Sequence, residues 1–325
     1  MKTITLEEHY ASPLFLEGPG KRLKEQAKDP ESLYGKVFEH LCDLGDRRIG
    51  QMDAAGVDEQ VLSLTAPGVE QLDGGEAVKI AEEANSFLAG AIRSHPKRFA
   101  GFAALPTADP RAAVVELERA IQDYGFKGAA INGHVKGRYL DDRFFWPILE
   151  RAESLNVPIY LHPTQAPKAV IDASYSGFDP NISNILAGAG WGWHIETATH
   201  VIRLILGGVF DQYPNLQFII GHLGEALPFM LQRLDQFFPT KATKLRKPFG
   251  AYLRENLHYT FSGFNYTATF LDLFLEVGVD RIMFSIDYPY GSMQKGQDFL
   301  NNLPICAADK ERIAHGNAER LLRIE

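Results

Sequence analysis

The sequence predicts an α/β protein with the fold of a distorted (β/α)8 TIM barrel, in which eight parallel strands alternate with helices. Eight short apolar runs rich in β-branched residues alternate with longer amphipathic segments along the 325 residues. Strands that alternate with helices are typical of βαβ units and of a parallel sheet. Because no change of composition and no linker divides the chain, we expect a single barrel domain over residues 1–325.

The expected strands are short apolar runs bounded by glycine, proline or polar residues. In chain order they cover residues 4–9, 59–65, 99–105, 126–132, 157–162, 216–222, 257–262 and 281–287. Segments between them, such as 77–95 and 111–125, repeat their apolar residues at helical spacing and are expected to be helices of the barrel.

Two connections are too long to be simple turns. They cover residues 10–36 and 163–193, and both carry several aromatic residues and glycines. In a parallel barrel both leave the C-terminal ends of their strands, which form the face that holds the active site in this fold. Loops of this length in a compact domain are usually functional, so we expect lids or substrate walls. The alternative is an exposed insertion or an oligomer contact.

The composition and charge exclude several classes of partner. The chain is 45% hydrophobic and 23% charged, with a formal net charge of −8, and its most basic stretch is the short segment 241–247. We therefore expect no nucleic-acid partner. Cys42 and Cys306 form no CxxC pair, so neither a disulfide framework nor a cysteine zinc site is expected. No apolar stretch approaches the roughly 20 residues that span a bilayer, and no secretory leader is apparent, so we expect a cytoplasmic protein with no membrane partner.

Histidine and acidic residues stand at the ends of strands that are far apart in the chain. Glu7 and His9 end the first strand, His162 ends a middle strand and Asp287 ends the last. Strand residues two apart point to the same face, so Glu7 and His9 can reach one ion while Glu8 points away. Each residue alone has an ordinary reading as a hydrogen-bonded histidine or a turn-forming aspartate. Together they predict a site for one divalent ion, Zn²⁺ or Mn²⁺, with Mg²⁺ as a third option.

Four motifs extend this pattern, and they resemble a known family. The segments ITLEEHY (4–10), LHP (161–163), GHLGE (221–225) and SIDYP (285–289) are similar to motifs of the amidohydrolase superfamily. Within it, the chain resembles the metal-dependent decarboxylases of the γ-resorcylate and 2,3-dihydroxybenzoate type over essentially its whole length. The resemblance implies that Glu7, His9, His162 and Asp287 bind the ion. It also implies a catalytic pair of His222 and Glu225. Their spacing of one helical turn supports this pair, although a purely structural role for His222 is the alternative.

The activity that this resemblance implies is non-oxidative decarboxylation of a small hydroxylated aromatic carboxylic acid, the expected substrate. Asp287 is the first candidate for the acid that protonates the ring carbon, and His222 is the second. The alternatives are a mononuclear hydrolase or hydratase of the same superfamily, or a catalytically silent scaffold on the same barrel. A binuclear site is disfavoured because the fourth strand ends in Ile-Asn-Gly (131–133), and its only lysine, Lys127, stands at its start.

Four further residues are candidates for substrate binding. Asn132 is expected to donate a hydrogen bond to a distal hydroxyl or carboxylate, with an ordinary Asn-Gly turn as the alternative. Arg233 resembles the family's arginine that reaches a neighbouring subunit's site, and its alternative is a surface arginine. The resemblance therefore implies a homodimer or homotetramer. Phe15 and Tyr290 are expected to wall the aromatic ring, although aromatic residues are also common core fillers.

Overall fold

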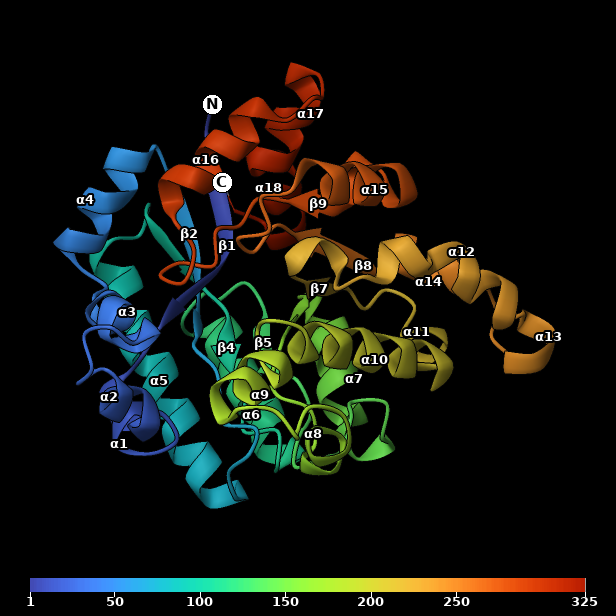
Figure 1. The fold of residues 1–325 in the computed structure, drawn as a ribbon, viewed down its shortest axis with the longest axis horizontal. Coiled ribbons are helices and arrows are strands. Elements are labelled where there is room, and N and C mark those ends of the chain that lie inside the picture. Colours follow the sequence, from blue (N-terminus) through green and yellow to red (C-terminus); the bar gives the residue numbers. More distant parts are fainter. Residues whose placement is uncertain (325) are drawn as a thin grey trace.

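The strands form a parallel barrel surrounded by helices in the computed structural model, which describes residues 1–324 (Figure 1). Strands β1-β2-β3 form one sheet, and β4 to β9 form a second sheet in sequence order. Phe102 joins the two, because β3 and β4 flank it and its backbone N–H donates to the Leu62 carbonyl at 2.9 Å. A parallel bridge between Leu6 and Ser285 closes the other side. The predicted distorted (β/α)8 barrel is confirmed.

All eight predicted strands occur, and the third is divided into β3 and β4. The observed bounds are β1 Ile4–Tyr10, β2 Glu59–Leu64, β3 Phe99–Gly101, β4 Ala103–Ala104, β5 Ala129–Asn132, β6 Ile159–His162, β7 Phe218–Ile220, β8 Leu257–Thr260 and β9 Ile282–Met283. The predicted extents of the sixth and last strands are wrong, because β7 ends before His222 and β9 ends before Asp287. Both of these residues adopt positive φ, which takes the backbone out of the strand conformation.

The helices include the two that were predicted individually, now α5 and α6. The bounds are α1 Pro13–Glu17, α2 Lys21–Gln26, α3 Leu33–Cys42, α4 Asp46–Ala55, α5 Gly74–Ser94, α6 Pro110–Gln122, α7 Trp146–Leu155, α8 Lys168–Ser174, α9 Pro180–Ala187, α10 Gly192–Leu206, α11 Val209–Gln212, α12 Leu227–Phe237, α13 Thr240–Thr243, α14 Phe249–Glu255, α15 Thr267–Val277, α16 Met293–Asn302, α17 Ala307–Glu311 and α18 Asn317–Leu322. Short turns of other helix types lie at Arg143–Phe145, His222–Gly224, Val279–Arg281 and Arg312–Gly316. Within residues 1–324, no helix is long and apolar enough to cross a membrane.

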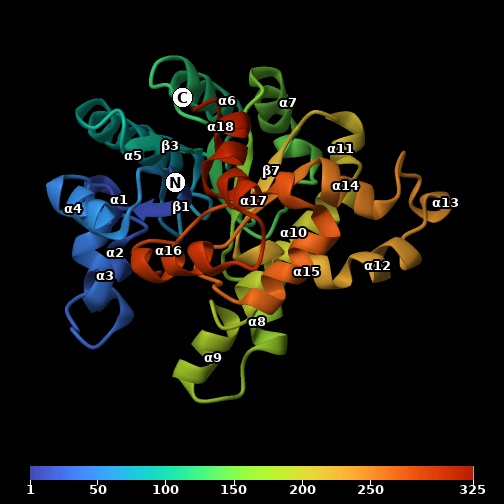
Figure 2. The same cartoon turned by 90° about the horizontal axis from the view of Figure 1, so that it is seen from above.

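The two long connections are not irregular loops. Residues 10–36 contain α1, α2 and the start of α3, and residues 163–193 contain α8, α9 and the start of α10. Figure 2 shows α8 and α9 projecting from the body of the molecule. Both segments therefore have secondary structure of their own, which the glycine-rich composition did not predict.

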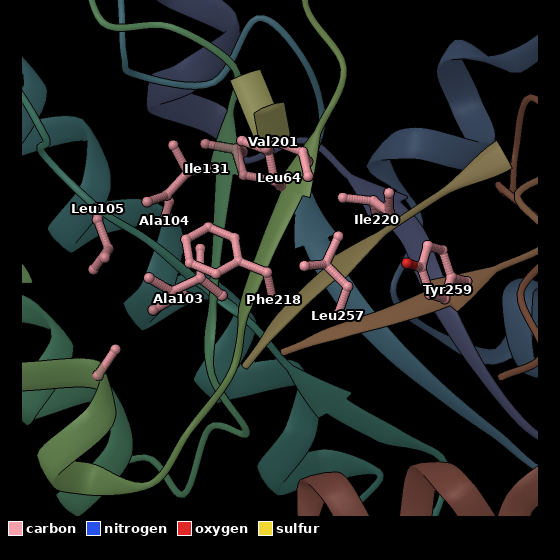
Figure 3. Close-up of a cluster of buried hydrophobic side chains, with 14 of the residues drawn as sticks. Leu64, Ala103, Ala104, Leu105, Ile131, Val201, Phe218, Ile220, Leu257 and Tyr259 are labelled. Atoms are coloured by element: carbon pink, nitrogen blue, oxygen red, sulfur yellow. The ribbon is translucent and has the colours of Figure 1, made fainter. Parts of the chain in front are cut away.

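Side chains alternate between two apolar layers along each strand. Phe218 and Ile220 of β7 face the helices, where Phe218 lies beside its register partner Leu257 (Figure 3). Ile219, between them, faces the barrel interior with Leu6 and other side chains of a second cluster. This alternation is the one expected of a closed barrel. It also directs the polar residues at the strand ends toward a common centre.

Candidate metal centre

The four predicted ligands lie together at the C-terminal ends of the strands. Each offers one donor atom, and these four atoms all lie within 4.8 Å of one another. His9 Nε2 is 3.0 Å from Asp287 Oδ1, and His162 Nε2 is 3.5 Å from Glu7 Oε1. Glu7 and His9 are each 1% exposed and His162 is 7% exposed. Asp287 is partly exposed, and residues separated by up to 280 positions in the chain thus form one cluster, as predicted.

The backbone reaches this arrangement through an irregularity in β1. The pairing of β1 with β2 shifts register between Thr5 and Glu8, and Glu7 has a φ of 66°. Asp287 has the same φ. A non-glycine residue in this region costs of the order of 1–3 kcal/mol and is held there by its surroundings. The two-residue spacing of Glu7 and His9 therefore acts through a bulge and not through a regular strand.

Burial makes charge expensive at this cluster. Burial raises the pKa of Glu7 to about 8, and it raises the pKa of Asp287 to about 7 despite the opposing effect of His222. Burial, assisted by Arg48, lowers the pKa of His9 to about 3. Two neutral imidazoles and two carboxyl groups that resist ionisation form a donor set that a divalent cation would stabilise in its deprotonated form.

An unsatisfied atom marks the place where the cation would bind. Glu7 Oε1 is buried, and no residue among 1–324 donates a hydrogen bond to it. Nitrogen and carboxylate oxygen donors of this kind suit Mn²⁺ and Zn²⁺. The protein therefore contains a candidate site for a single metal ion, formed by Glu7, His9, His162 and Asp287.

Glu8 points away from this site, as expected, but it has a role that the sequence analysis missed. Its carboxylate accepts hydrogen bonds from the backbone N–H groups of Ile286 at 2.9 Å and Tyr288 at 3.0 Å, on either side of Asp287. Burial raises the pKa of Glu8 to about 8, against the effect of these hydrogen bonds and of Arg48. Glu8 thus ties β1 to the segment that presents Asp287. The available signal was an acidic residue inside a strand with two buried faces.

His222 and Glu225 form a buried ion pair beside the cluster. His222 Nδ1 lies 2.8 Å from Glu225 Oε1. Burial opposes the charge on His222, but Glu225, Glu7 and Asp287 outweigh it and raise the pKa of His222 to about 10. Burial likewise opposes ionisation of Glu225, yet His222 and His194 lower its pKa.

The pair does not lie on a regular helical turn, so that part of the prediction is wrong. His222, Leu223, Glu225 and Ala226 all have positive φ, and the chain makes a left-handed turn here. This turn, rather than an i, i+3 helix position, brings the carboxylate back to the imidazole.

His194 is a third member of this group, and the sequence analysis missed it. Its Nδ1 lies 2.6 Å from Glu225 Oε2 and its Nε2 lies 3.0 Å from the carbonyl oxygen of Ala189. Both partners are acceptors, so the ring donates on both sides. Phe264 packs against the rings of His194 and His222, with centroid distances of 5.1 Å and 5.0 Å. His194 stands on α10 and ends no strand, and the glycine- and tryptophan-rich run before it was the only available signal.

Asn132 and Tyr290 lie next to the metal cluster. Asn132 pairs with His162 in the register of β5 and β6, and its backbone N–H donates to Glu70 at 2.8 Å. Burial raises the pKa of Glu70 to about 7, although hydrogen bonds from the Asn132 backbone and side chain lower it. Asn132 Oδ1 is buried and receives no hydrogen bond within residues 1–324. Asn132 Oδ1 is thus free to accept a hydrogen bond, and the expected role of Asn132 as a donor to the substrate stays a prediction. The Tyr290 ring lies 5.5 Å from the His9 ring.

Phe15, Arg233 and Lys127 lie elsewhere. Phe15 is fully buried in the main core and packs against Gly20. Arg233 is exposed on α12, with its guanidinium 3.8 Å from the centre of the Phe237 ring. Lys127 donates to the carbonyl of Arg323 beyond the other end of β5, so it is not placed to bridge two metal ions. The expected roles of Phe15 and Arg233 stay predictions.

A parallel barrel with a candidate single-metal site and a buried histidine–glutamate pair at its C-terminal face belongs to the class of metal-dependent barrel enzymes. The family model described as amidohydrolase matches residues 37–324, and the chain therefore belongs to the amidohydrolase family.

Comparison with characterised proteins gives full-length matches. The chain is 38% identical to the gamma-resorcylate decarboxylase of Rhizobium sp. (strain MTP-10005) over 335 residues, which covers 99% of this chain and 98% of the relative. It is similar to the crystal structure of a dihydroxybenzoic acid decarboxylase from Polaromonas sp. JS666 with bound manganese and the inhibitor 2-nitroresorcinol (36% identity, TM-score 0.88, 99% and 97% covered). It is also similar to the 5-carboxyvanillate decarboxylase of Novosphingobium aromaticivorans, complexed with manganese and 4-hydroxy-3-methoxy-5-nitrobenzoic acid (34% identity, TM-score 0.91, 99% and 96% covered).

Proposed function

We propose that this protein is a divalent-metal-dependent carboxy-lyase that releases CO₂ from a hydroxybenzoate-type acid of the dihydroxybenzoate or salicylate class. One observation carries the proposal. The cluster of Glu7, His9, His162 and Asp287 lies beside the His222–Glu225 pair in a chain that is 38% identical, over 99% of its length, to a gamma-resorcylate decarboxylase. The manganese in similar structures makes Mn²⁺ the first ion to test.

The reaction needs a proton before it releases CO₂. Direct loss of CO₂ from an aromatic ring would leave an aryl carbanion of very high energy. If the carboxyl-bearing carbon is protonated first, the electrons of the breaking C–C bond return to the ring as CO₂ leaves. An ortho phenolate assists, because its charge flows to the carbon that receives the proton. When bound, the divalent ion would supply Lewis-acid chemistry and a fixed point of attachment for the oxygens of the acid.

The remaining roles, which are proton transfer and substrate binding, fall to side chains of this protein. Asp287 is the proposed proton donor, because its carboxyl group lies with the residues that would hold the ion and the acid. His222, kept cationic by Glu225, is proposed to stabilise the phenolate and to exchange the phenolic proton. Asn132 would accept a hydrogen bond from a distal ring hydroxyl through Oδ1. Tyr290, whose ring lies 5.5 Å from the His9 ring, would form part of the apolar wall.

The proposal includes a homodimer or homotetramer. Arg233 lies beside exposed apolar side chains of α12, among them Phe229 at 79% and Phe237 at 55% exposure. Large exposed apolar side chains that cluster on one helix are typical of an interface. We propose that this face meets a second copy, with Arg233 supplied to that copy's site. A cytoplasmic location is also part of the proposal, because the free cysteines Cys42 and Cys306 persist in a reducing compartment.

A substrate panel on metal-analysed protein tests the function. Protein loaded with Mn²⁺ would be mixed with salicylate and with 2,3-, 2,4- and 2,6-dihydroxybenzoate, and both the loss of the acid and the release of CO₂ would be measured. We expect turnover of at least one acid, and no turnover by Asp287→Asn. A metal-loaded protein that turns over no member of the panel, yet hydrolyses a lactone or amide, would replace the proposal by its hydrolytic alternative.

A further inference from the structure

Three hydroxyl groups in the barrel interior converge on one oxygen of Glu7. The hydroxyls of Tyr160 and Ser262 both donate to Glu7 Oε2, and Thr260 Oγ1 lies 3.4 Å from the same oxygen. All three side chains are at most 2% exposed. The other oxygen of Glu7, Oε1, faces His162 and receives no hydrogen bond within residues 1–324. The carboxylate is thus divided between one oxygen that the barrel holds and one oxygen that is free for the metal site.

The hydroxyl protons can be followed one by one, because each hydroxyl group has only one. Tyr160 gives its proton to Glu7 and therefore accepts from Thr260, whose Oγ1 lies 2.7 Å away. Ser262 gives its proton to Glu7 as well and accepts from Ser285 at 3.3 Å. The Ser285 oxygen in turn accepts the Ser262 backbone N–H at 2.6 Å. In this network Glu7 Oε2 accepts two hydrogen bonds, from Tyr160 and Ser262, and Thr260 and Ser285 donate to these two hydroxyls in turn.

The backbone leaves room for this arrangement at Gly221. A Cβ atom at this position would lie 2.5 Å from Glu7 Oε2 and 2.5 Å from Ser262 Oγ. The chain after β7 therefore passes directly against the hydrogen-bonded oxygen, and any side chain here would displace the carboxylate. Together with the positive φ of Glu7, this close approach fixes the carboxylate from the backbone side.

We infer that Tyr160, with Thr260 and Ser262, is a positioning group that holds Glu7 as a one-oxygen ligand of the divalent ion. The inference rests on the metal site of the proposed function but not on the identity of the substrate. A carboxylate whose second oxygen is occupied by hydroxyl donors cannot chelate the ion through both oxygens, so a coordination position stays open for the acid. Hydrogen-bond partners of metal ligands typically change metal affinity 10–100-fold when they are removed.

Metal titration without substrate tests this inference. Metal-free protein would be titrated with Mn²⁺, and free Mn²⁺ would be followed by its electron paramagnetic resonance signal. We expect Tyr160→Phe to weaken Mn²⁺ binding about 10–100-fold. The matched control is Tyr259→Phe, which removes an equally buried hydroxyl that donates to the Leu253 carbonyl at 2.6 Å, and it should bind Mn²⁺ like the unmodified protein.

Each outcome decides a different point. If Tyr160→Phe binds Mn²⁺ as tightly as the Tyr259→Phe control, the positioning role is refuted while the metal site stands. If the unmodified protein binds no Mn²⁺, the metal centre of the proposed function fails, and this inference fails with it. Should Tyr160→Phe not fold, Ser262→Ala removes a second donor to the same oxygen. That variant is expected to weaken Mn²⁺ binding about tenfold, and unchanged affinity would refute the role.

Discussion

Replacement of Glu225 is the most direct test of the proposed role of His222 in proton transfer. Its two oxygens bind His222 at 2.8 Å and His194 at 2.6 Å. In Glu225→Gln one of these oxygens becomes an NH₂ group, which cannot accept from an imidazole N–H. One histidine must then lose its hydrogen bond or change its tautomer, and the negative charge between the two rings disappears.

The size of the effect follows from the electrostatics of His222. A pKa raised from 6.5 to about 10 corresponds to about 5 kcal/mol of preference for the charged ring. Glu7 and Asp287 contribute to this preference, but a divalent ion bound to them would compensate their charge, which leaves Glu225 as the main partner. Loss of a general acid or base typically costs about 10²–10⁴ in rate, or roughly 3–5 kcal/mol, which is consistent with this upper limit.

The assay is kcat/KM against pH on the acid identified by the substrate panel. We expect Glu225→Gln to reduce kcat/KM by about 10²–10⁴ and to move the alkaline limb to lower pH, because His222 loses its proton more readily. NMR titration of the His222 ring would report the same change without turnover. Glu196→Gln is the control, since Glu196 is a buried carboxylate on α10 that accepts from Tyr139 at 2.6 Å. A Glu225→Gln variant with the activity and pH profile of this control would refute the reasoning.

Three further predictions concern stability and metal binding. Burial lowers the pKa of His200 to about 3, and its Nε2 accepts from the Leu140 backbone at 2.9 Å, so the unfolded chain takes up the proton first as the pH falls below about 6.5. The free energy of unfolding should therefore fall on acidification. Urea unfolding of His200→Gln should show a fall between pH 7 and pH 5 that is smaller by about 2 kcal/mol than that of the unmodified protein. An unchanged dependence of the free energy of unfolding on pH would contradict this. Removal of the ion with a chelator should lower the free energy of unfolding by about 3 kcal/mol relative to protein in Mn²⁺ at a hundredfold excess over its Kd. The unfolding temperature should fall and should recover when Mn²⁺ is added back. An unaffected unfolding temperature would argue against a bound ion. Gly221→Ala should cost about 1–3 kcal/mol and weaken Mn²⁺ binding through its clash with Glu7, while Gly75→Ala, which meets no atom within 4 Å, should do neither.

The sequence predicts those parts of the site that follow from strand direction. Glu7, His9 and His162 lie in strands whose apolar patterns are clear, and parallel strands in a barrel bring their C-terminal ends together. Asp287 was assigned to the right end of the barrel even though β9 ends four residues before it. The ligand set therefore depended on topology, and small errors in strand length did not affect it.

The parts that the sequence did not predict depend on side chains and on positive φ. His194 reaches the site from a helix, and no periodicity distinguishes it from a surface histidine. Tyr160 looks like an ordinary apolar strand residue, because its ring belongs to the interior cluster and only its hydroxyl reaches Glu7. The direction of the Asn132 amide depends on Glu70, a residue in another connection. Such partners become apparent only when the strands are placed in space.

The metal cluster and the His222–Glu225 pair are held in place by different parts of the fold: the first by the barrel, the second also by the connection 163–193. The hydroxyl network fixes Glu7 from inside the barrel, through Tyr160 of β6, Thr260 of β8 and Ser262. Glu225, in contrast, is held in a left-handed turn by His194, which also donates to Ala189 in the turn between α9 and α10. A shift of that turn would move His194 and leave Glu225 with one partner, but it would not alter the donors to Glu7. It follows that the hydrogen bonds to Glu7 depend on the barrel alone, whereas the charge on His222 depends in addition on how the connection 163–193 is seated.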